Sequence, residues 1–213
     1  MIIDFHTHRL DATAAIISVD PRRFDPHPGL YYSVGFHPWE DVTHLTGQDF
    51  DLLEQCAAHP QVVAIGETGM DRVKGGELEG QRAAFVRHLH LAHRLGMPVV
   101  VHCVRTAQDI LAARRWAGLD QVPLAIHGMR GNEHVARTLL DAGCFLSFGP
   151  RFNEAALRIT PHDRLLIETD DSHVSIDAVA DAVAQYVGLA ASEVKALASA
   201  NASRFIACKH DDS

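Results

Sequence analysis

Short apolar segments alternate along this chain with stretches of helical periodicity, and that alternation restricts the possible folds more than any other feature. Alternating strands and helices are typical of βα units that build a parallel sheet. Eight apolar segments are present, so we expect an α/β protein of the TIM-type (β/α)8 barrel class. The predicted strands are Ile2–His8, Ala15–Val19, Tyr31–Phe36, Val62–Glu67, Pro98–Cys103, Val122–His127, Cys144–Phe148 and Arg164–Thr169.

Several helices are clearly marked. Thr46 and Asp49 form a capping-box pattern, and Thr106 followed by Asp109 suggests a second cap. The longest predicted helix runs from Leu78 to Leu95 and ends before a Gly-Met-Pro sequence. It contains His88, His90 and His93, which we expect to be surface or packing residues, because residues two apart on a helix point about 200° away from each other. Further helices are predicted at Glu133–Ala142 and Ser192–Arg204.

The early part of the chain lacks room for two of the helices. Only Arg9–Ala14 separates the first two predicted strands, and Asp20–Leu30, with three prolines, separates the next two. A parallel crossover usually needs about a dozen residues or more. We therefore expect a trimmed or distorted barrel with helices missing around the first three strands, unless Ala15–Val19 is not a regular barrel strand. The length of 213 residues predicts one domain over residues 1–213.

Composition excludes some classes of protein. The net charge of -8 argues against an extensive basic surface for polyanions. No apolar run reaches the roughly 18 to 20 residues of a membrane span, and the N-terminus does not resemble a signal peptide, so we expect a cytoplasmic protein without a membrane or obligate protein partner. The cysteines lack CxxC spacing and are predicted to be buried thiols: Cys56, Cys103, Cys144 and Cys208.

Residues that commonly bind metals stand at the ends of five predicted strands. They are His6, His8, Glu67, His102, His127 and Asp170. The carboxyl ends of barrel strands gather on one face, and alternate residues of a strand share a side, so these side chains should converge there. Six such ligands exceed the needs of one tetrahedral ion and predict two divalent ions. No predicted strand ends in a lysine, which leaves Glu67 as the natural bridge. Asp4 either orients the histidines or is a hydrogen-bonded carboxylate lower in the barrel.

Seven motifs, spread over nearly the whole chain, carry a family resemblance. They are Asp4-Phe5-His6-Thr7-His8, Gly35-Phe36-His37-Pro38, Ile65-Gly66-Glu67-Thr68-Gly69-Met70-Asp71, Val101-His102-Cys103, Ile126-His127-Gly128, Ile167-Glu168-Thr169-Asp170 and Asn201-Ala202-Ser203-Arg204-Phe205. As an ordered set they resemble the TatD family of metal-dependent hydrolases, within the wider amidohydrolase-like barrels.

The resemblance implies a divalent-metal phosphodiesterase of the deoxyribonuclease type, with Zn, Mn or Mg as the metal. It implies one ion on His6, His8, Glu67 and Asp170 and a second on Glu67, His102 and His127. Asp170 would accept a proton from the metal-activated water, and Glu67 is the second catalytic candidate. Candidate substrate contacts are Arg105, Arg130, His37, Asp71 and His173. Two departures from the family pattern stand out: Arg105 is shifted by one residue, and Thr169-Asp170-Asp171-Ser172 lacks the proline of the usual Thr-Asp-x-Pro and adds a second acid.

Three functions are compatible with this site. The favoured one is a two-metal phosphodiesterase acting on DNA ends or short nucleic acid, because the trimmed barrel leaves little wall for duplex DNA. The second is a related barrel hydrolase acting on an amide, a lactone or another small carbonyl compound with the same metal chemistry. The third is a non-catalytic metal-binding protein, against which the presence of Asp170 argues.

Overall fold

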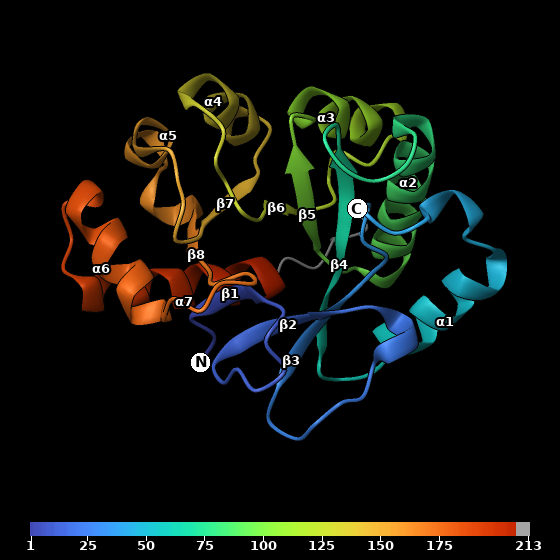
Figure 1. Ribbon diagram of the computed structural model, residues 1–213, viewed down its shortest axis with the longest axis horizontal. Helices are drawn as coiled ribbons and strands as arrows, with labels where there is room; N and C mark the ends of the chain where they lie inside the picture. Colours follow the sequence, from blue (N-terminus) through green and yellow to red (C-terminus); the bar gives the residue numbers. More distant parts are fainter. Residues whose placement is uncertain (208–213) are drawn as a thin grey trace.

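All eight predicted strands form, and each pairs in parallel with the next until the last meets the first. The structure is a computed structural model and describes residues 1–207. The closed barrel is confirmed, with Asp4 of the first strand opposite Ile167 of the last (Figure 1). The strands are β1 (Asp4–Thr7), β2 (Ala15–Val19), β3 (Tyr31–Val34), β4 (Val62–Asp71), β5 (Val99–Val104), β6 (Leu124–Ile126), β7 (Phe145–Phe148) and β8 (Leu165–Ile167).

The expected trimming lies between β1 and β3. β2 pairs in parallel with both of its neighbours and is therefore a regular barrel strand. The alternative, that Ala15–Val19 is not a regular barrel strand, is wrong. Residues 8–14 connect β1 to β2 without a helix, and the β2–β3 connection holds only the 3-10 helix η1 (Pro21–Arg23). This side of the barrel therefore lacks the outer helical layer present elsewhere.

Seven α-helices follow β3 within the described residues. They are α1 (Gly47–Ala57), α2 (Leu78–Leu95), α3 (Ala107–Trp116), α4 (Glu133–Asp141), α5 (Glu154–Ile159), α6 (Ile176–Val187) and α7 (Ala191–Ala207), with short 3-10 turns η2 (Val42–His44) and η3 (His162–Arg164). The capping box of Thr46 and Asp49 is confirmed. The predicted cap at Thr106 is wrong: its hydroxyl instead donates to the Met70 carbonyl at 2.7 Å, which ties α3 to β4.

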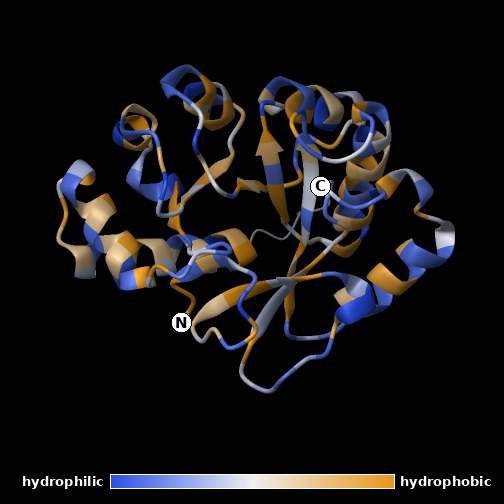
Figure 2. Ribbon diagram, in the orientation of Figure 1, coloured by the Kyte–Doolittle hydropathy of each residue, from blue (hydrophilic) through white to orange (hydrophobic). Residues whose placement is uncertain are grey.

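Hydrophobic residues fill two layers, one between the strands and the helices and one inside the barrel (Figure 2). Phe205 of α7 belongs to the inner layer, and its ring meets Phe5 at 5.3 Å and Phe145 at 5.4 Å between centroids. Inner residues such as Val100 and Ala125 each stand two positions before a histidine of the predicted site. The apolar core therefore fills the amino end of the barrel and leaves the carboxyl end to polar side chains.

His88 of α2 is a packing residue. It is fully buried; its Nε2 accepts the backbone N–H of Phe36 at 3.1 Å, and its Nδ1 lies 2.7 Å from the Ala84 carbonyl. Burial lowers the pKa of His88 to about 4, so the ring is neutral near pH 7.

Cys56, Cys103 and Cys144 are free thiols, the first and last of them buried, whereas Cys208 lies outside the described residues. None of the helices within residues 1–207 combines the length and the apolar character needed to cross a membrane.

Candidate metal centre

An irregularity in β1 decides how its side chains are directed. The register between β1 and β2 shifts between Asp4 and Thr7, so regular alternation is interrupted there. Asp4 accepts hydrogen bonds from the backbone N–H (2.9 Å) and the hydroxyl (2.6 Å) of Thr169, and it thereby links β1 to the residues after β8. Burial raises the pKa of Asp4 to about 6. Of the two alternatives for Asp4, the structure thus favours a hydrogen-bonded carboxylate between strands over one that orients an imidazole.

Two glycines allow β4 to bring Glu67 into the barrel. The register between β4 and β5 shifts between Ile65 and Thr68, which adds one residue to β4. Gly66 (φ 132°) and Gly69 (φ 145°) adopt backbone conformations that other residues rarely take. A Cβ at either position would collide with a backbone carbonyl of β5. The glycines therefore permit the close strand contact beside the buried Glu67.

One oxygen of Glu67 faces the histidines of β1. Glu67 Oε2 lies 3.2 Å from the Nε2 atoms of both His6 and His8. Asp170 Oδ1 lies 3.9 Å from His6 Nε2 and 3.7 Å from His8 Nε2. Two imidazoles and two carboxylates therefore meet on this side of Glu67.

The other oxygen of Glu67 faces the histidines of β5 and β6. Glu67 Oε1 lies 2.6 Å from His127 Nε2 and 2.7 Å from His102 Nδ1. Those two nitrogens are 3.2 Å apart. Together with the first group, this brings all six predicted ligands into one cluster, with Glu67 between two sets of donors.

The atoms of the cluster fit a divalent cation. Each ring nitrogen of His102 faces a carboxylate: Nε2 lies 3.0 Å from Asp71 Oδ2, and Nδ1 lies 2.7 Å from Glu67 Oε1. With its proton directed at Asp71, the ring would offer the lone pair of Nδ1 to an ion beside Glu67. His6 Nε2 and Glu67 Oε2 are buried and have no hydrogen-bond partner among residues 1–207. Lone pairs that converge in a buried site are stabilised by a cation between them, and imidazole with carboxylate suits a divalent one.

The electrostatics of the cluster favour positive charge around Glu67. Burial would raise the pKa of Glu67, but His127 and His6 outweigh it and hold that pKa well below its ordinary value. Burial would lower the pKa of His127, yet Glu67 and Glu168 keep it well above the usual range. Burial would also lower the pKa of His8, but Glu67 and Asp170 outweigh it and raise that pKa. Burial and the neighbouring His127 lower the pKa of His6.

Two carboxylates contact His102 of β5 and His127, which follows β6, on the side away from Glu67. Asp71 Oδ2 contacts His102 Nε2, and Glu168 Oε1 lies 3.4 Å from His127 Nδ1 while it accepts the N–H of Gly128 at 2.7 Å. The Glu168 contact is an ion-pair distance, since His127 Nδ1 has no hydrogen-bond partner among residues 1–207. Carboxylates in these positions can orient a metal-binding imidazole. We assigned no role to Glu168 from the sequence. Alternation with the inward-facing Leu166 was the signal that could have located it.

His37 is a hydrogen-bond donor in this arrangement. Its Nδ1 accepts the backbone N–H of Trp39 at 3.0 Å, so the proton of the ring is on Nε2. Nε2 lies 2.9 Å from Glu67 Oε1. Although His37, Glu67 and His102 lie close enough to share an ion, the proton on His37 Nε2 argues against coordination by this ring.

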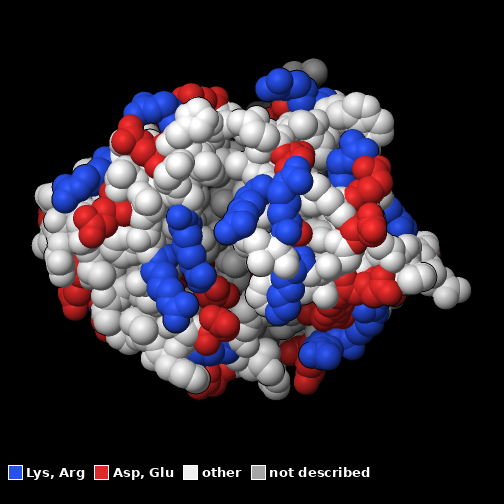
Figure 3. Space-filling model, turned by 45° about the horizontal axis from the view of Figure 1, so that its top comes forward, with Lys and Arg blue, Asp and Glu red and all other residues white. Residues whose placement is uncertain are grey.

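The remaining predicted substrate contacts lie at different distances from the cluster. Asp71 is turned toward His102 and Trp39, whose indole N–H donates to it at 2.6 Å. Arg130 Nη2 lies 4.0 Å from Asp170 Oδ2. Arg105 (φ 56°) and His173 are exposed. On the face toward which β5 points, Lys and Arg side chains flank a hollow (Figure 3).

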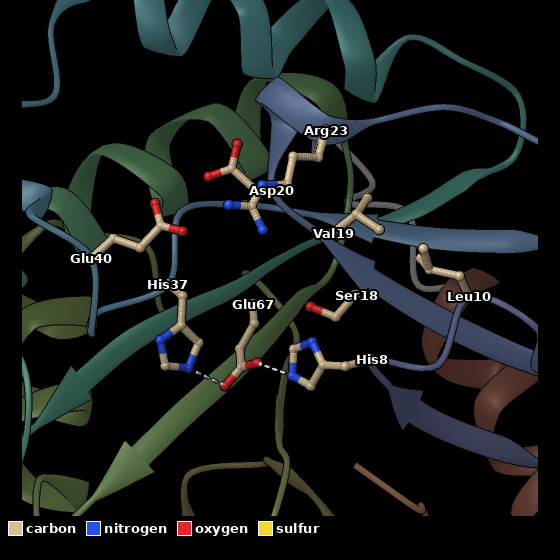
Figure 4. A pocket seen from close by; sticks show the side chains of 10 residues that line it. His8, Leu10, Ser18, Val19, Asp20, Arg23, His37, Glu40 and Glu67 are labelled. Atoms are coloured by element: carbon tan, nitrogen blue, oxygen red, sulfur yellow. Dashed lines mark hydrogen bonds and ion pairs between the residues drawn. The ribbon is translucent and has the colours of Figure 1, made fainter. Parts of the chain in front are cut away.

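A cavity of about 340 Å³ opens beside the cluster, over the ends of β1, β2 and β3. His8, His37 and Glu67 form its inner end, and Arg23 and Glu40 lie farther out (Figure 4). The volume is within the range of small-molecule sites. The cavity lies on the side of the barrel where the outer helices are missing.

A closed parallel barrel that gathers imidazoles and carboxylates at its carboxyl end defines the class of barrel metal-dependent hydrolases. Residues 22–207 match the family described as "TatD related DNase". The chain belongs to the TatD family, and the resemblance carried by its motifs is confirmed.

Relatives and solved structures agree with this assignment. The chain is 34% identical over 159 residues to "Uncharacterized metal-dependent hydrolase TatD" of Mycobacterium tuberculosis, covering 68% of this chain and 60% of the relative. It is 36% identical over 154 residues to "3'-5' ssDNA/RNA exonuclease TatD" of Cronobacter turicensis, covering 68% and 58%. The match therefore spans less than two thirds of these relatives.

The fold is shared with the TatD homologue YjjV of Escherichia coli K12. The TM-score is 0.82 at 20% identity, over 96% of this chain and 97% of that one. A TatD family hydrolase of Entamoeba histolytica has a TM-score of 0.78 at 15% identity, over 96% and 97%.

Proposed function

We propose that this chain is a two-metal phosphodiesterase that acts on nucleic acid, with Glu67 bridging the ions. The observation that carries the proposal is that Oε2 of Glu67 faces His6 and His8, whereas Oε1 faces His102 and His127. The two sets adjoin, since His127 also lies within 4.8 Å of His6 and Asp170. His6, His8 and Asp170 would hold one ion, and His102 and His127 the other. The name of the Cronobacter turicensis relative supports nucleic acid as the substrate. Zn, Mn and Mg all remain candidates.

Divalent ions at such a site supply hydroxide near neutral pH and neutralise charge that develops on a phosphoryl oxygen. The side chains of this chain would orient the water, accept its proton and hold the phosphate.

Asp170 would accept the proton of the attacking water. It is partly exposed, unlike Glu67, and it lies at the edge of the cluster beside His8. Its backbone has φ 55°, and hydrogen bonds to the main chain of His6 (2.9 Å) and His8 (3.2 Å) hold it there. A non-glycine residue in this region costs on the order of 1 to 3 kcal/mol, and such residues cluster at functional sites.

His37 and two arginines would contact the substrate. The Nε2 proton of His37 can be donated to a phosphoryl oxygen as well as to Glu67. Arg130, close to Asp170, and Arg105, at the end of β5, can each hold a phosphate through two N–H groups. His173 and Asp71 remain substrate candidates, although Asp71 already has four hydrogen-bond partners in the chain.

One observation favours the second candidate, hydrolysis of a small carbonyl compound. The cavity beside the cluster is small and is lined by Asp20 and Glu40 as well as Arg23. Two carboxylates near the entrance would repel a phosphodiester backbone, whereas a neutral amide or lactone would not be repelled.

The test is a metal-dependent activity screen. Chelated protein is supplied with Mg²⁺, Mn²⁺ or Zn²⁺ and offered a chromogenic phosphodiester, a single-stranded oligonucleotide, and a panel of lactones and amides. We expect phosphodiester hydrolysis that disappears on chelation and returns with one metal. Turnover of carbonyl compounds alone would favour the second candidate, and no turnover with any metal would favour a non-catalytic metal-binding protein.

Two substitutions connect that activity to the site. Glu67→Ala and Asp170→Asn should abolish hydrolysis while the circular dichroism spectrum stays native. Glu79→Gln, a change to an exposed carboxylate of α2, is the matched control and should retain full activity. Normal rates from either site variant would refute the assignment.

A further inference from the structure

We propose that Trp39 binds an unpaired base of the substrate by stacking, immediately beside the metal centre. This inference rests on the proposed action on nucleic acid and adds a specificity-determining residue to it. Neither the composition nor the motifs of the sequence singled out Trp39.

Trp39 is exposed although it contacts the core of the site. The residue is 46% exposed, yet its ring centroid lies 4.8 Å from that of His37 and 5.3 Å from that of His102. Trp116, the other tryptophan, is 77% exposed at the end of α3 and contacts none of the predicted metal ligands in the described residues. A tryptophan exposed at the metal centre offers a large apolar surface to a ligand.

The orientation of the indole is fixed before any ligand binds. Its Nε1–H donates to Asp71 Oδ2 at 2.6 Å, and its backbone N–H donates to His37 Nδ1. Asp71 is itself held by the backbone N–H groups of Val73 (2.7 Å) and Lys74 (3.0 Å). A ring held in this way loses little conformational entropy when a ligand stacks on it.

A positive charge lies against the same ring. The ammonium of Lys74 is 3.4 Å from the centroid of the Trp39 ring, and the Lys74 side chain is exposed. An exposed cation–π contact contributes about 0.5 to 1 kcal/mol, whereas stacking of a base on an aromatic ring contributes about 1 to 3 kcal/mol. A base would therefore displace the flexible Lys74, whose ammonium could then pair with a neighbouring phosphate.

A purely structural role for Trp39 makes a different prediction. If the indole served only to hold Asp71 and thereby His102, its replacement would affect all substrates alike. Stacking, in contrast, requires that the substrate carry a base. The comparison of a base-bearing oligonucleotide with an abasic one of equal length separates the two roles.

The kinetic test uses the full chain loaded with its activating metal, oligothymidylate, and an abasic oligomer of the same length. Trp39→Leu should raise KM for oligothymidylate about tenfold more than KM for the abasic oligomer, a difference within the range expected for one stacked base. Trp39→Phe keeps a ring but loses the N–H, so it should preserve most of the difference between the two oligomers. Equal changes in KM for both oligomers in Trp39→Leu would overturn the proposal.

A binding test does not depend on turnover. Trp116→Phe combined with Asp170→Asn leaves Trp39 as the only tryptophan in a protein expected to be inactive. We expect oligothymidylate to quench its fluorescence and the abasic oligomer to leave it unchanged. Equal responses to both, or none, would overturn stacking. If quenching occurs but the wild-type protein hydrolyses neither oligomer, the stacking site stands and the proposed hydrolase function fails.

Discussion

The two histidines of β5 and β6 each point one ring nitrogen at Glu67 and the other at a supporting carboxylate. From the sequence, Asp71 was predicted to contact substrate and Glu168 was given no role. The candidate metal centre therefore depends on two carboxylates, Asp71 and Glu168, that contact its histidines on the side away from Glu67.

Replacing Glu168 should weaken metal binding without dismantling the site. Glu168→Gln keeps an oxygen for the N–H of Gly128 but removes the charge beside His127 Nδ1. Loss of such a partner typically reduces metal affinity about 10- to 100-fold. Titration of the chelated protein with Zn²⁺ measures the effect, and Asp51→Asn on the exposed part of α1 is the control. Equal affinities for wild type and Glu168→Gln would show that Glu168 does not support His127.

His88 should make the folded state sensitive to mild acid. Its pKa falls from 6.5 to about 4 on folding, so between these values only the unfolded chain takes up the proton. The stabilising contribution is fully present above pH 6.5 and is lost as the pH falls toward 4, by about 3 kcal/mol. His88→Gln still offers an acceptor to the Phe36 N–H but does not titrate.

The measurement is the free energy of unfolding at several pH values between 7 and 4 for chelated protein. His88→Gln should show a shallower decline than wild type, whereas His90→Gln, an exposed position on the same helix, should not. Parallel profiles for His88→Gln and wild type would contradict the assignment of the buried neutral ring.

At the scale of single elements, Gly69 should tolerate no side chain. A Cβ there would collide with the carbonyl of His102, and φ is 145°. Gly69→Ala is therefore expected to destabilise the fold by about 2 kcal/mol or more and to weaken metal binding, since it displaces His102. Gly76→Ala is the control, because a Cβ at Gly76 meets no atom within 4 Å. Denaturant unfolding distinguishes them, and an unchanged midpoint for Gly69→Ala would contradict this reading of β4.

Most strands and the longest helix could be predicted because their signals are local. The predicted Leu78–Leu95 helix agrees with α2 at both ends, since its stripe of apolar residues and its Gly96 stop are both encoded within the segment. β4, however, continues four residues beyond the predicted end at Glu67. Gly66 and Gly69 interrupt the apolar pattern there, and only the pairing with β5 makes this part of the chain a strand.

Irregular pairing and short helices were not predictable in the same way. Strict alternation put Asp4 on the face of His6, but a register shift in β1 turned it toward Thr169. α5 and α6 were not assigned, and Thr106 bonds to Met70 of β4 instead of capping its own helix. In each case, packing against a distant segment decides the conformation.

At the scale of the whole molecule, the prediction of the cluster depended only on the expected barrel of parallel strands. Once the strands are parallel, residues at their carboxyl ends must meet, whatever their separation in the sequence, and the six predicted ligands do. Trp39 could not be found in this way, because it follows β3 in a loop and reaches the cluster through its contacts with His37, His102 and Asp71.

The absence of helices between the first three strands and the distribution of charge also affect the surroundings of the site. The cavity opens over β1 to β3, whose connections contain no α-helix, next to His8 and His37. The net charge of -8 coexists with Lys and Arg side chains that flank the hollow of the site face (Figure 3). Asp and Glu side chains border the same hollow (Figure 3), so the site face carries charges of both signs.

The central claim is that this cluster holds two divalent ions bridged by Glu67. Anomalous diffraction from crystals of the Mn²⁺- or Zn²⁺-loaded protein tests it most directly. We expect two peaks, one in contact with His6, His8 and Asp170 and one with His102 and His127, with Glu67 touching both. Ions bound only elsewhere, a single peak at the cluster, or two peaks of which Glu67 contacts only one would contradict it.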